Sequence, residues 1–485
     1  MRVVFSLNYI IHKITAFSRP HSHFVHKLSE NVYCYRFDKV VKYNRKRAVG
    51  SPPKMGEDNM NLANCIEEIK GERVRNLFAE LYGNQDYVIE NQQQRYAQAL
   101  KSFHEYFPNR EEIKIYSAPG RTEVGGNHTD HQRGIVLAGA VNLDVIGIVS
   151  FHDEGIARVK SEGYPLAEIP LRDFTPNSND DGTTALVKGV IAKFIEKGVK
   201  VGGFDMYTTS DVICGGGISS SAAFETLVGT VVNLKYNNGD STPFEIAQYG
   251  QFAENVFFGK SCGLLDQTVS SYGGLVSIDF KDLTAPVIEK VDFDFEKYGY
   301  TLCITDTKSS HENLTGDYVA IREEMKQIAD YFECEVLSEV DVKEFYHFLP
   351  NIRNFCSDRA IMRAMHFFAE TKRAYDEAQA LKNKDVDLFL KLVNESGISS
   401  GNLLQNLYSN STPTEQAIPL ALAISKSILG DKGAVRVHGG GFAGTIQAFV
   451  PTEMVNEYKE GMERVYGEGA CHQMKIRPYG GIEIV

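Results

Sequence analysis

Apolar residues recur along this chain at two different spacings, and the spacing separates predicted helices from predicted strands. Spacings of three and four residues predict helices, because such positions share one helix face. They occur over 62–81, 91–107, 219–236, 243–258, 317–332, 357–381, 385–397, 414–428 and 452–465. Short apolar or alternating runs predict strands over 113–116, 135–150, 205–209, 274–280, 301–305, 434–438, 445–450 and 474–477. The first strand is expected to break at Ala118-Pro119-Gly120.

Helices and strands are mixed along the whole chain, which predicts an α+β (mixed α/β) fold in two domains. A polar and aromatic stretch, 292–300, separates the two groups of predicted elements. We place an N-terminal domain over 60–295 and a C-terminal domain over 296–485, after a basic tail of residues 1–59. The length of 485 residues is sufficient for this division, since a domain commonly contains about 150 residues.

The tail differs in charge from the rest of the chain. Residues 1–59 contain 11 of the 51 Lys and Arg residues but only four of the 63 Asp and Glu residues. The apolar run 3–11 is interrupted by His12 and Lys13 and lacks a cleavage site, so it is a poor secretory signal. The basic segment Lys42–Arg47 is an alternative interaction arm. We favour a third interpretation, a start codon assigned too far upstream of Met60, because Gly56-Glu57 must be encoded by a purine-rich stretch that resembles a bacterial ribosome-binding site.

Bulk composition argues against several classes of protein. The hydrophobic content of 43% and the charged content of 24% are typical of globular chains, and no run of about 18 apolar residues predicts a membrane span. A net charge of −12 argues against a general nucleic-acid binder, because phosphate backbones require a basic surface. The eight cysteines are scattered without a CxxC pair, which indicates a reducing cytoplasm. We therefore expect a cytoplasmic protein, a monomer or weak oligomer, that binds neither nucleic acid nor membrane.

A glycine-rich segment at the start of the predicted helix 219–236 is the clearest functional feature. It consists of Gly215, Gly216, Gly217, Ile218, Ser219, Ser220 and Ser221. Glycines allow a tight turn with exposed N–H groups, and the helix start adds positive partial charge, so the segment predicts a cradle for phosphates. It lacks the GxxxxGK[ST] pattern of a P-loop, and the chain lacks the HRD and DFG elements of protein kinases. Taken alone, the segment is equally compatible with a glycine turn capped by serine.

Two further glycine-rich motifs extend this prediction. Gly120–His131 is similar to the galactokinase signature G-R-x-N-x-I-G-E-H-T-D-Y, and Gly439–Gly444 resembles its third motif, G-G-G-F-G-G. Gly215–Ala223 resembles the second motif of the GHMP small-molecule kinase superfamily, in the version found in galactokinases. The resemblance extends from about residue 70 to the C-terminus. It implies a GHMP kinase fold with an N-terminal α/β domain, a ferredoxin-like α+β C-terminal domain and an active site in the cleft between them.

The resemblance implies that ATP and Mg²⁺ are used to phosphorylate the anomeric hydroxyl of α-D-galactose. Gly263–Gln267 resembles the family segment C-G-x-M-D-Q, whose aspartate is the catalytic base, so this role falls to Asp266. Arg121 matches the arginine beside that aspartate and the transferred phosphoryl group. Ser221 and Glu254 match the two metal ligands, and the glycine-rich segment ending at Ser221 would bind ATP. Without the resemblance, these side chains are also compatible with a helix cap, a surface ion pair and an exposed helix glutamate.

The resemblance also implies a set of sugar contacts. These are Asn127, His128, Thr129, Asp130, Gly263 and Tyr318. Asp130 matches a residue placed to accept hydrogen bonds from two neighbouring ring hydroxyls, a contact that discriminates sugar epimers. Tyr318 matches less closely, and a buried core tyrosine is the alternative there. His128, Asp130 and His131 are also spaced like ligands of a metal cluster, which is a second interpretation of this motif.

Three polar positions depart from the galactokinase signature. Asn127 stands where the family has a glutamate, Glu123 where it has an asparagine, and His131 where it has a tyrosine. Asparagine keeps an acceptor but loses the charge, so we expect altered recognition of the sugar's hydroxymethyl end. A kinase for N-acetylgalactosamine, arabinose or another galactose-like sugar is therefore the first alternative. A non-catalytic galactose sensor is the second, and the intact serine-alanine pair at 221–222 argues against it.

Overall fold

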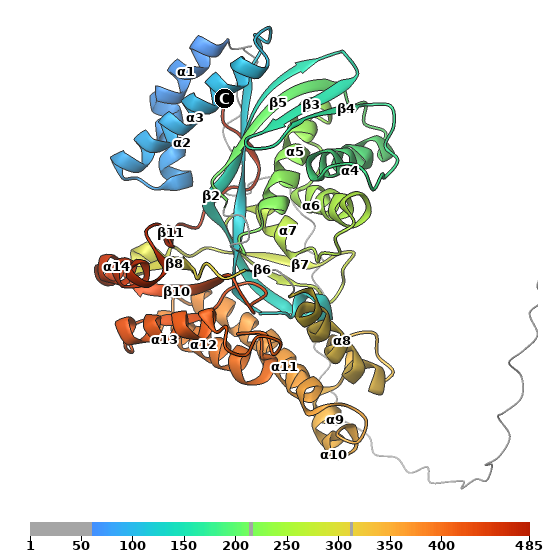
Figure 1. Cartoon of the computed structure of the whole chain (residues 1–485), viewed down its shortest axis with the longest axis vertical. Helices are drawn as coiled ribbons and strands as arrows, with labels where there is room; N and C mark the ends of the chain where they lie inside the picture. The colour runs from blue at the N-terminus through green and yellow to red at the C-terminus, as the bar shows by residue number, and fades with distance from the viewer. Residues whose placement is uncertain (1–60, 213–216, 311–313) are drawn as a thin grey trace, which may run out of the picture. The chain divides into compact units, whose positions relative to one another are not determined.

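Two β-sheets organise the part of the chain that the computed structural model describes, residues 61–212, 217–310 and 314–485. The predicted tail, 1–59, lies outside these residues. Within them, the larger sheet has eight strands and the smaller sheet has four. Helices pack beside both sheets (Figure 1), which confirms the predicted mixture of α and β structure.

The larger sheet is built around one long strand, β2 (Ile135–His152). Six of its strands follow the order β12 (Ile482–Glu483), β1 (Lys114–Gly125), β2, β5 (Gly203–Ser210), β3 (Ile156–Ser161) and β4 (Leu166–Pro170). β6 (Leu275–Asp279) pairs with the start of β2 and with β7 (Val287–Val291). Because β2 is 18 residues long, its first part pairs with β6 and its last part with β5.

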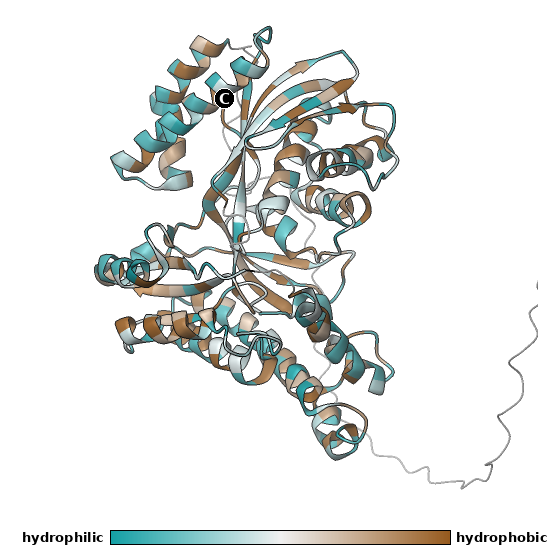
Figure 2. Cartoon of the chain, viewed as in Figure 1, coloured by the Kyte–Doolittle hydropathy of each residue, from teal (hydrophilic) through white to brown (hydrophobic). Residues whose placement is uncertain are grey.

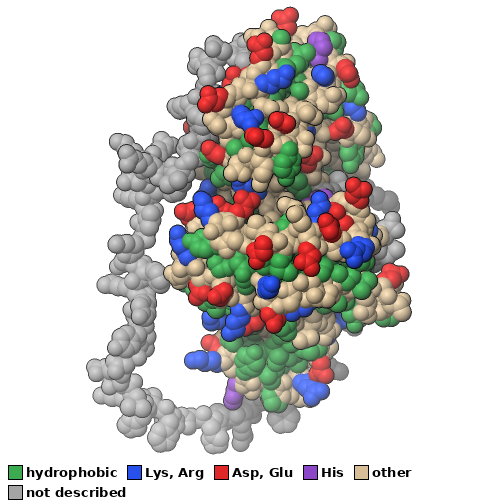
Figure 3. All heavy atoms as spheres, turned by 90° about the vertical axis from the view of Figure 1, so that its left-hand side faces the viewer, with side chains coloured by type: hydrophobic (Ala, Val, Ile, Leu, Met, Phe, Trp, Pro, Cys, Tyr) green, Lys and Arg blue, Asp and Glu red, His purple; other side chains and the backbone are tan. Residues whose placement is uncertain are grey.

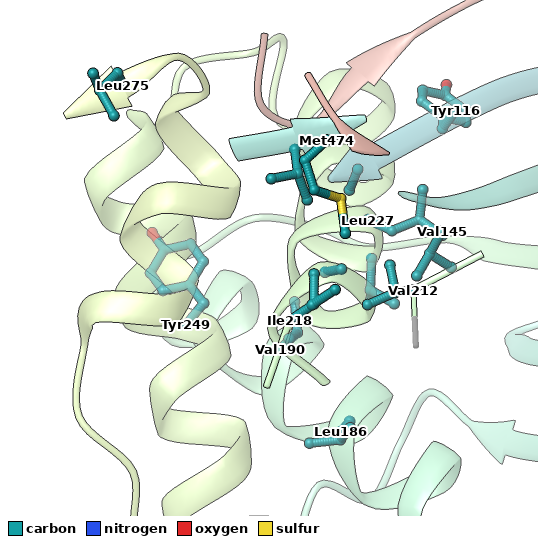
Figure 4. Packing of buried hydrophobic residues seen from close by; sticks show 14 of the residues in the cluster. Tyr116, Val145, Leu186, Val190, Val212, Ile218, Leu227, Tyr249, Leu275 and Met474 are labelled. Carbon is teal, nitrogen blue, oxygen red and sulfur yellow. The ribbon is translucent and has the colours of Figure 1, made fainter. Parts of the chain in front are cut away.

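Alternating side chains place separate hydrophobic cores on the two faces of this sheet. Ile115 and Ile146 share a core with the N-terminal helices, which are α1 (Leu62–Lys70), α2 (Glu72–Tyr82) and α3 (Asp86–Tyr106). Tyr116 and Val145, one residue along each strand, belong to the other core (Figure 4). The helices on that side are α4 (Gly182–Glu196), α5 (Ser220–Tyr236), α6 (Pro243–Phe252) and α7 (Leu265–Tyr272).

The smaller sheet is antiparallel throughout and follows the order β11 (Cys471–Met474), β8 (Tyr300–Asp306), β10 (Thr445–Pro451) and β9 (Ala434–Val437). Between β8 and β9 the chain forms α8 (Thr315–Tyr331), α9 (Val342–His347), α10 (Leu349–Ile352), α11 (Asp358–Lys382), α12 (Val386–Ser399) and α13 (Ala417–Leu429). α14 (Val455–Tyr466) connects β10 to β11. The C-terminal elements therefore follow the order strand, helices, two strands, helix, strand. This is the order of a ferredoxin-like unit, as predicted for the C-terminal region.

Strand β1 continues through the point where the sequence predicts a break. Pro119 pairs with Asp144 and Arg121 pairs with Ala140, so the register with β2 shifts across Gly120. This irregularity lets a proline, which has no N–H to donate, remain inside the strand. The prediction that the strand ends near Pro119 was therefore wrong, and the extension carries Arg121 along the sheet.

Other differences concern the ends of elements. Gly71 has an extended backbone and divides the predicted helix 62–81 into α1 and α2. The predicted helix 243–258 is α6 followed by a π-helical turn, η2 (Ala253–Phe258). The last predicted strand, 474–477, is displaced, because β11 ends at Met474. The predicted domain boundary at 295/296 falls between β7 and β8 and stays a prediction.

The surface agrees with the composition. The outer helices carry both teal and brown in Figure 2, as expected for amphipathic helices that pack on one side. On the described part of the face in Figure 3, acidic and basic side chains are interspersed. Within the described residues, no helix combines the length and the apolar content needed to cross a bilayer.

Candidate active site

A cavity of about 480 Å³ opens where β1, the loop after it and the start of α7 meet the third glycine-rich motif. Its wall includes six of the site residues predicted from the sequence, namely Arg121, His128, Asp130, Gly263, Asp266 and Tyr318. Gly439 and Gly440 of the third motif also line it. Segments more than 300 residues apart in sequence therefore contribute to one cavity.

Asp266 and Arg121 form an ion pair at the edge of this cavity. The Arg121 Nε and Nη2 atoms each lie 2.7 Å from Asp266 Oδ1. Arg121 is largely buried, whereas the Asp266 side chain is 34% exposed. Ser219 donates a hydrogen bond to the second oxygen, Oδ2. The carboxylate is thus held from two sides and still accessible from the cavity.

The same ion pair touches the glycine-rich segment. Arg121 Nη1 donates to the carbonyl oxygen of Gly217, and the Arg121 backbone N–H donates to the carbonyl of Ile218 at 3.1 Å. A Cβ atom at Gly120 would lie 2.7 Å from that Ile218 oxygen, so this close approach requires glycine. The strand that carries Arg121 and the predicted phosphate loop are therefore in direct contact.

The described part of the predicted phosphate loop ends in the first turn of α5. Gly217 and Ser219 both have positive φ angles, 68° and 58°, and Ser220 begins the helix. Ile218 is 1% exposed and packs into the core (Figure 4), so its side chain anchors the loop rather than facing a ligand. Gly215 and Gly216 lie outside the described residues. The start of this 17-residue helix offers positive partial charge to an anion.

Ser221 and Glu254, the predicted metal ligands, are adjacent. Ser221 Oγ donates to Glu254 Oε1 at 3.1 Å, and Lys260 Nζ lies 2.9 Å from the same oxygen. Glu254 is 2% exposed and lies on η2, the π-helical turn that directly follows α6. Hydroxyl and carboxylate oxygens at the start of a helix fit a magnesium ion that also binds phosphates.

A second carboxylate, which sequence reasoning missed, stands behind this pair. Gln267 Nε2 lies 3.0 Å from Glu225 Oε2 and 3.0 Å from Glu254 Oε2, and so joins the two acids. Burial raises the pKa of Glu225 well above its ordinary value, and Glu254 adds to the rise. Glu225 follows Ser221 by four residues on one helix, a spacing that could have indicated its position. Glu225, Gln267 and Glu254 therefore form one buried polar network next to Ser221.

His128 and Asp130, two of the predicted sugar contacts, line another side of the cavity. His128 has a φ of 59° and its Nε2 lies 2.9 Å from the carbonyl oxygen of Gly440. A Cβ atom at Gly263 would lie 2.6 Å from Asp130 Oδ2, so glycine at 263 leaves room for this carboxylate. Burial raises the pKa of Asp130, His128 opposes the rise and Glu123 adds to it. This region can offer several hydrogen bonds to a polyhydroxylated ligand.

Tyr318, at the start of α8, closes another side of the cavity. Its hydroxyl donates to the carbonyl oxygen of Gly441 at 2.8 Å, and its ring makes an edge contact with Phe442. Burial raises the pKa of Tyr318 to about 12. The residue therefore links α8 to the third glycine-rich motif as well as lining the cavity.

Asn127 and Thr129 do not reach the cavity, which corrects their prediction as sugar contacts. Asn127 is fully buried, and its Nδ2 donates to Glu123 Oε1 at 3.0 Å and to the Gly439 carbonyl at 2.7 Å. Thr129 is also fully buried, and its hydroxyl donates to the carbonyls of Gly126 and Ile135, both at 2.8 Å. Both side chains use their polar groups to fix the loop, so neither is free to bind a sugar.

The cavity also includes residues that the sequence did not single out as ligands. They are Glu123, Arg133, Gln251, Cys262 and Arg322, and His131 of the metal-cluster interpretation lines the cavity as well. Burial lowers the pKa of His131 well below its ordinary value, and the neighbouring His128 and Arg322 contribute. In the described residues, no three His, Cys, Asp or Glu side chains are grouped to hold a metal ion, so the metal-cluster interpretation of His128, Asp130 and His131 finds no support.

Comparison with known proteins agrees with this geometry. Residues 101–151 match the family described as galactokinase galactose-binding signature, and residues 185–274 match the GHMP kinases N terminal domain. The chain is similar to a galactokinase of Glaesserella parasuis serovar 5 (strain SH0165), with 29% identity over 367 residues. That match covers 74% of this chain and 90% of the relative.

Solved structures share the fold. Lactococcus lactis galactokinase complexed with galactose has a TM-score of 0.67 and 23% identity, over 79% of this chain and 98% of that chain. Methanococcus jannaschii mevalonate kinase has a TM-score of 0.53 and 16% identity, over 75% of this chain and 98% of that chain. In the regions matched, the chain is similar to the GHMP kinases and, within them, to the galactokinases. The predicted GHMP fold is confirmed, and the similarity to GHMP kinases implies the use of ATP.

Proposed function

We propose that this protein transfers the γ-phosphoryl group of ATP to the anomeric hydroxyl of α-D-galactose and so makes galactose 1-phosphate. The observation that carries the proposal is the position of the Asp266–Arg121 pair. It lies on the wall of the sugar-side cavity and, through Gly217 and Ser219, against the phosphate loop. A carboxylate at this junction can reach both the hydroxyl that attacks and the phosphorus that is attacked.

The reaction follows from this arrangement. The anomeric hydroxyl gives its proton to the Asp266 carboxylate, and the electron pair of that oxygen forms the new bond to the γ-phosphorus. The bond from this phosphorus to the bridging oxygen breaks, and its electron pair leaves with ADP. Arg121 keeps Asp266 oriented through two contacts of 2.7 Å and places positive charge beside the transferring group.

Ser221 and Glu254 are proposed to hold Mg²⁺, which when bound neutralises charge on the phosphates. The 3.1 Å hydrogen bond between their side chains supports this assignment, because it places both oxygens at one point. Asp130, His128, Gly263 and Tyr318 are proposed to bind the sugar, because all of them line the cavity. Scattered cysteines support a cytoplasmic location.

Measurement of ADP release with a panel of sugars tests the proposal. Galactose is expected to give the highest kcat/KM, with lower values for N-acetylgalactosamine and arabinose. A higher value for either of these sugars would select the alternative kinase. No ADP release with any of them, together with intact sugar binding by calorimetry, would select the galactose sensor. The Asp266–Arg121 contact argues against the sensor, because a binding protein does not require a base at this junction.

A further inference from the structure

Glu123 occupies a position on β1 from which it can bind a ligand. It follows Arg121 by two residues, so both side chains lie on the same face of the strand, about 7 Å apart along it. Both residues line the cavity. Arg121 faces the reacting group, and Glu123 therefore lies farther along the wall, beside the rest of the sugar.

The two carboxylate oxygens of Glu123 have different surroundings. Oε1 accepts hydrogen bonds from Arg436 Nη2 at 2.6 Å and from Asn127 Nδ2 at 3.0 Å. Oε2 accepts none from the described residues and is not among their fully buried oxygens that lack a partner. Because the side chain is 9% exposed and lines the cavity, Oε2 is open toward it.

Both partners of Oε1 are rigidly held. Arg436 is fully buried on β9, and its Nη1 also donates to the Val124 carbonyl at 2.8 Å. Asn127 is tied to the third glycine-rich motif through Gly439 and accepts a hydrogen bond from Asn406 Nδ2 at 2.9 Å. Two fixed donors on one oxygen leave the other oxygen in a defined direction, which is the arrangement expected of a binding carboxylate.

The sequence supplies an independent observation. Relative to the galactokinase signature quoted above, the chain has glutamate at 123 in place of asparagine and asparagine at 127 in place of glutamate. The two side chains that differ are in direct contact at 3.0 Å. The pair therefore still contains one carboxylate and one amide, with the carboxylate moved to the residue that lines the cavity.

We propose that Glu123 is a sugar-binding and specificity-determining residue of this protein, and that Asn127 is the positioning residue that holds it. This inference rests on the proposed function. Glu123 Oε2 accepts a hydrogen bond from one hydroxyl of the sugar other than the reacting anomeric hydroxyl. Asn127 is fully buried, so it acts on the sugar only through Glu123.

The substitution Glu123→Gln tests the contact, with ADP release measured on galactose and on its 2-deoxy, 3-deoxy, 4-deoxy and 6-deoxy analogues. With galactose we expect KM to rise about 10- to 100-fold, because a hydrogen bond to a charged group is weakened, while kcat changes less than about threefold. With one of the analogues the substitution should have no further effect, since that sugar lacks the hydroxyl bound by Glu123. An equal increase in KM for every sugar would overturn the inference and assign Glu123 a structural role.

The exchange variant Glu123→Asn/Asn127→Glu controls for the loss of charge beside Arg436. It keeps one carboxylate and one amide in the pair, and its KM is expected to be closer to the wild-type value than that of Glu123→Gln. A KM no better than that of Glu123→Gln would overturn the role of the pair. Wild-type protein that releases no ADP with galactose would refute the proposed function itself. Turnover by the wild type with an unchanged KM in Glu123→Gln would refute only this inference.

Discussion

The two sides of the cavity hold their charged groups in different ways. Beside the phosphate loop, Asp266 is partly exposed and is paired with a single arginine. Beside the first motif, Glu123, Glu370 and Glu377 are buried close to Arg436, and both oxygens of Glu370 and one of Glu123 are hydrogen-bonded within the protein. The first side is arranged for chemistry on an open carboxylate. On the second side the protein's own network fixes the wall, which allows a residue such as Asn127 to be important without touching the ligand.

Substitution of Asp266 should have the largest effect and tests the open side. Asp266→Asn keeps the size of the side chain but removes the base, so kcat is expected to fall about 10²-fold or more while ATP binding is retained. Steady-state ADP release and calorimetry with ATP measure the two quantities. Asp240→Asn, at an exposed position, is the matched control and should behave as the wild type. Turnover in Asp266→Asn close to that of the wild type would remove Asp266 from its proposed role.

Substitution of Glu254, in the proposed metal site on the same side of the cavity, should reduce activity less than substitution of Asp266. Glu254→Gln preserves a hydrogen bond to Ser221 but removes the charge, so the concentration of Mg²⁺ giving half-maximal activity should rise about tenfold or more. Binding of Mn²⁺ in the presence of ADP, followed by electron paramagnetic resonance, provides a readout independent of turnover. An unchanged metal dependence in both measurements would contradict the assignment of Glu254.

The buried side is tested by the pH dependence of stability. Glu377 is fully buried, and neither carboxylate oxygen has a hydrogen-bond partner among the residues that the structure describes. Burial together with Glu370 raises the pKa of Glu377 well above the usual range. Between the unfolded pKa and this higher folded pKa, only the unfolded state ionises, so rising pH destabilises the fold.

We expect the free energy of unfolding of the wild type to fall, relative to Glu377→Gln, by up to about 1.4 kcal/mol per pH unit in that window. Urea denaturation from pH 5 upward measures the difference. Glu415→Gln, at an exposed position, should run parallel to the wild type. Parallel curves for Glu377→Gln as well would show that Glu377 is ionised in the folded protein.

Loss of the Tyr318 hydroxyl should give the smallest effect. Tyr318→Phe removes the hydrogen bond to the Gly441 carbonyl but keeps the ring against Phe442. We expect a destabilisation of about 1 kcal/mol, measured by urea denaturation, and an increase in KM for galactose of only a few-fold. An increase of about 100-fold or more would indicate that the hydroxyl binds the sugar directly.

The sequence predicted the chemical side of the site better than the buried side. Arg121 and Asp266 were identified from short local motifs, and the structure places the two side chains in contact. Asn127 and Thr129 belong to the same motif as residues that line the cavity, but burial decides whether a side chain faces a ligand. That property depends on partners such as Gly439 and Asn406, far along the chain, and no local pattern reveals it.

The fold shows the same limit. Most helices and strands follow from apolar spacing, because each buries one face against a core. The passage of β1 through Pro119 depends on pairing with β2, and the π-helical turn η2 depends on neighbouring helices. Glu225 and Gln267 are missed for this reason also, since their contact with Glu254 arises only after α5, η2 and α7 are packed together.

The close approach between Gly120 and the carbonyl oxygen of Ile218 has a consequence for substrate binding. The proposed phosphate loop and the backbone of Arg121 are in direct contact here, so we expect a movement of the loop on binding ATP to displace the cavity wall as well. In that case occupancy by either substrate would alter the affinity for the other, and thermodynamic linkage would require the two changes to be equal. A bulky residue at position 120 would therefore impair communication between the substrates as well as packing.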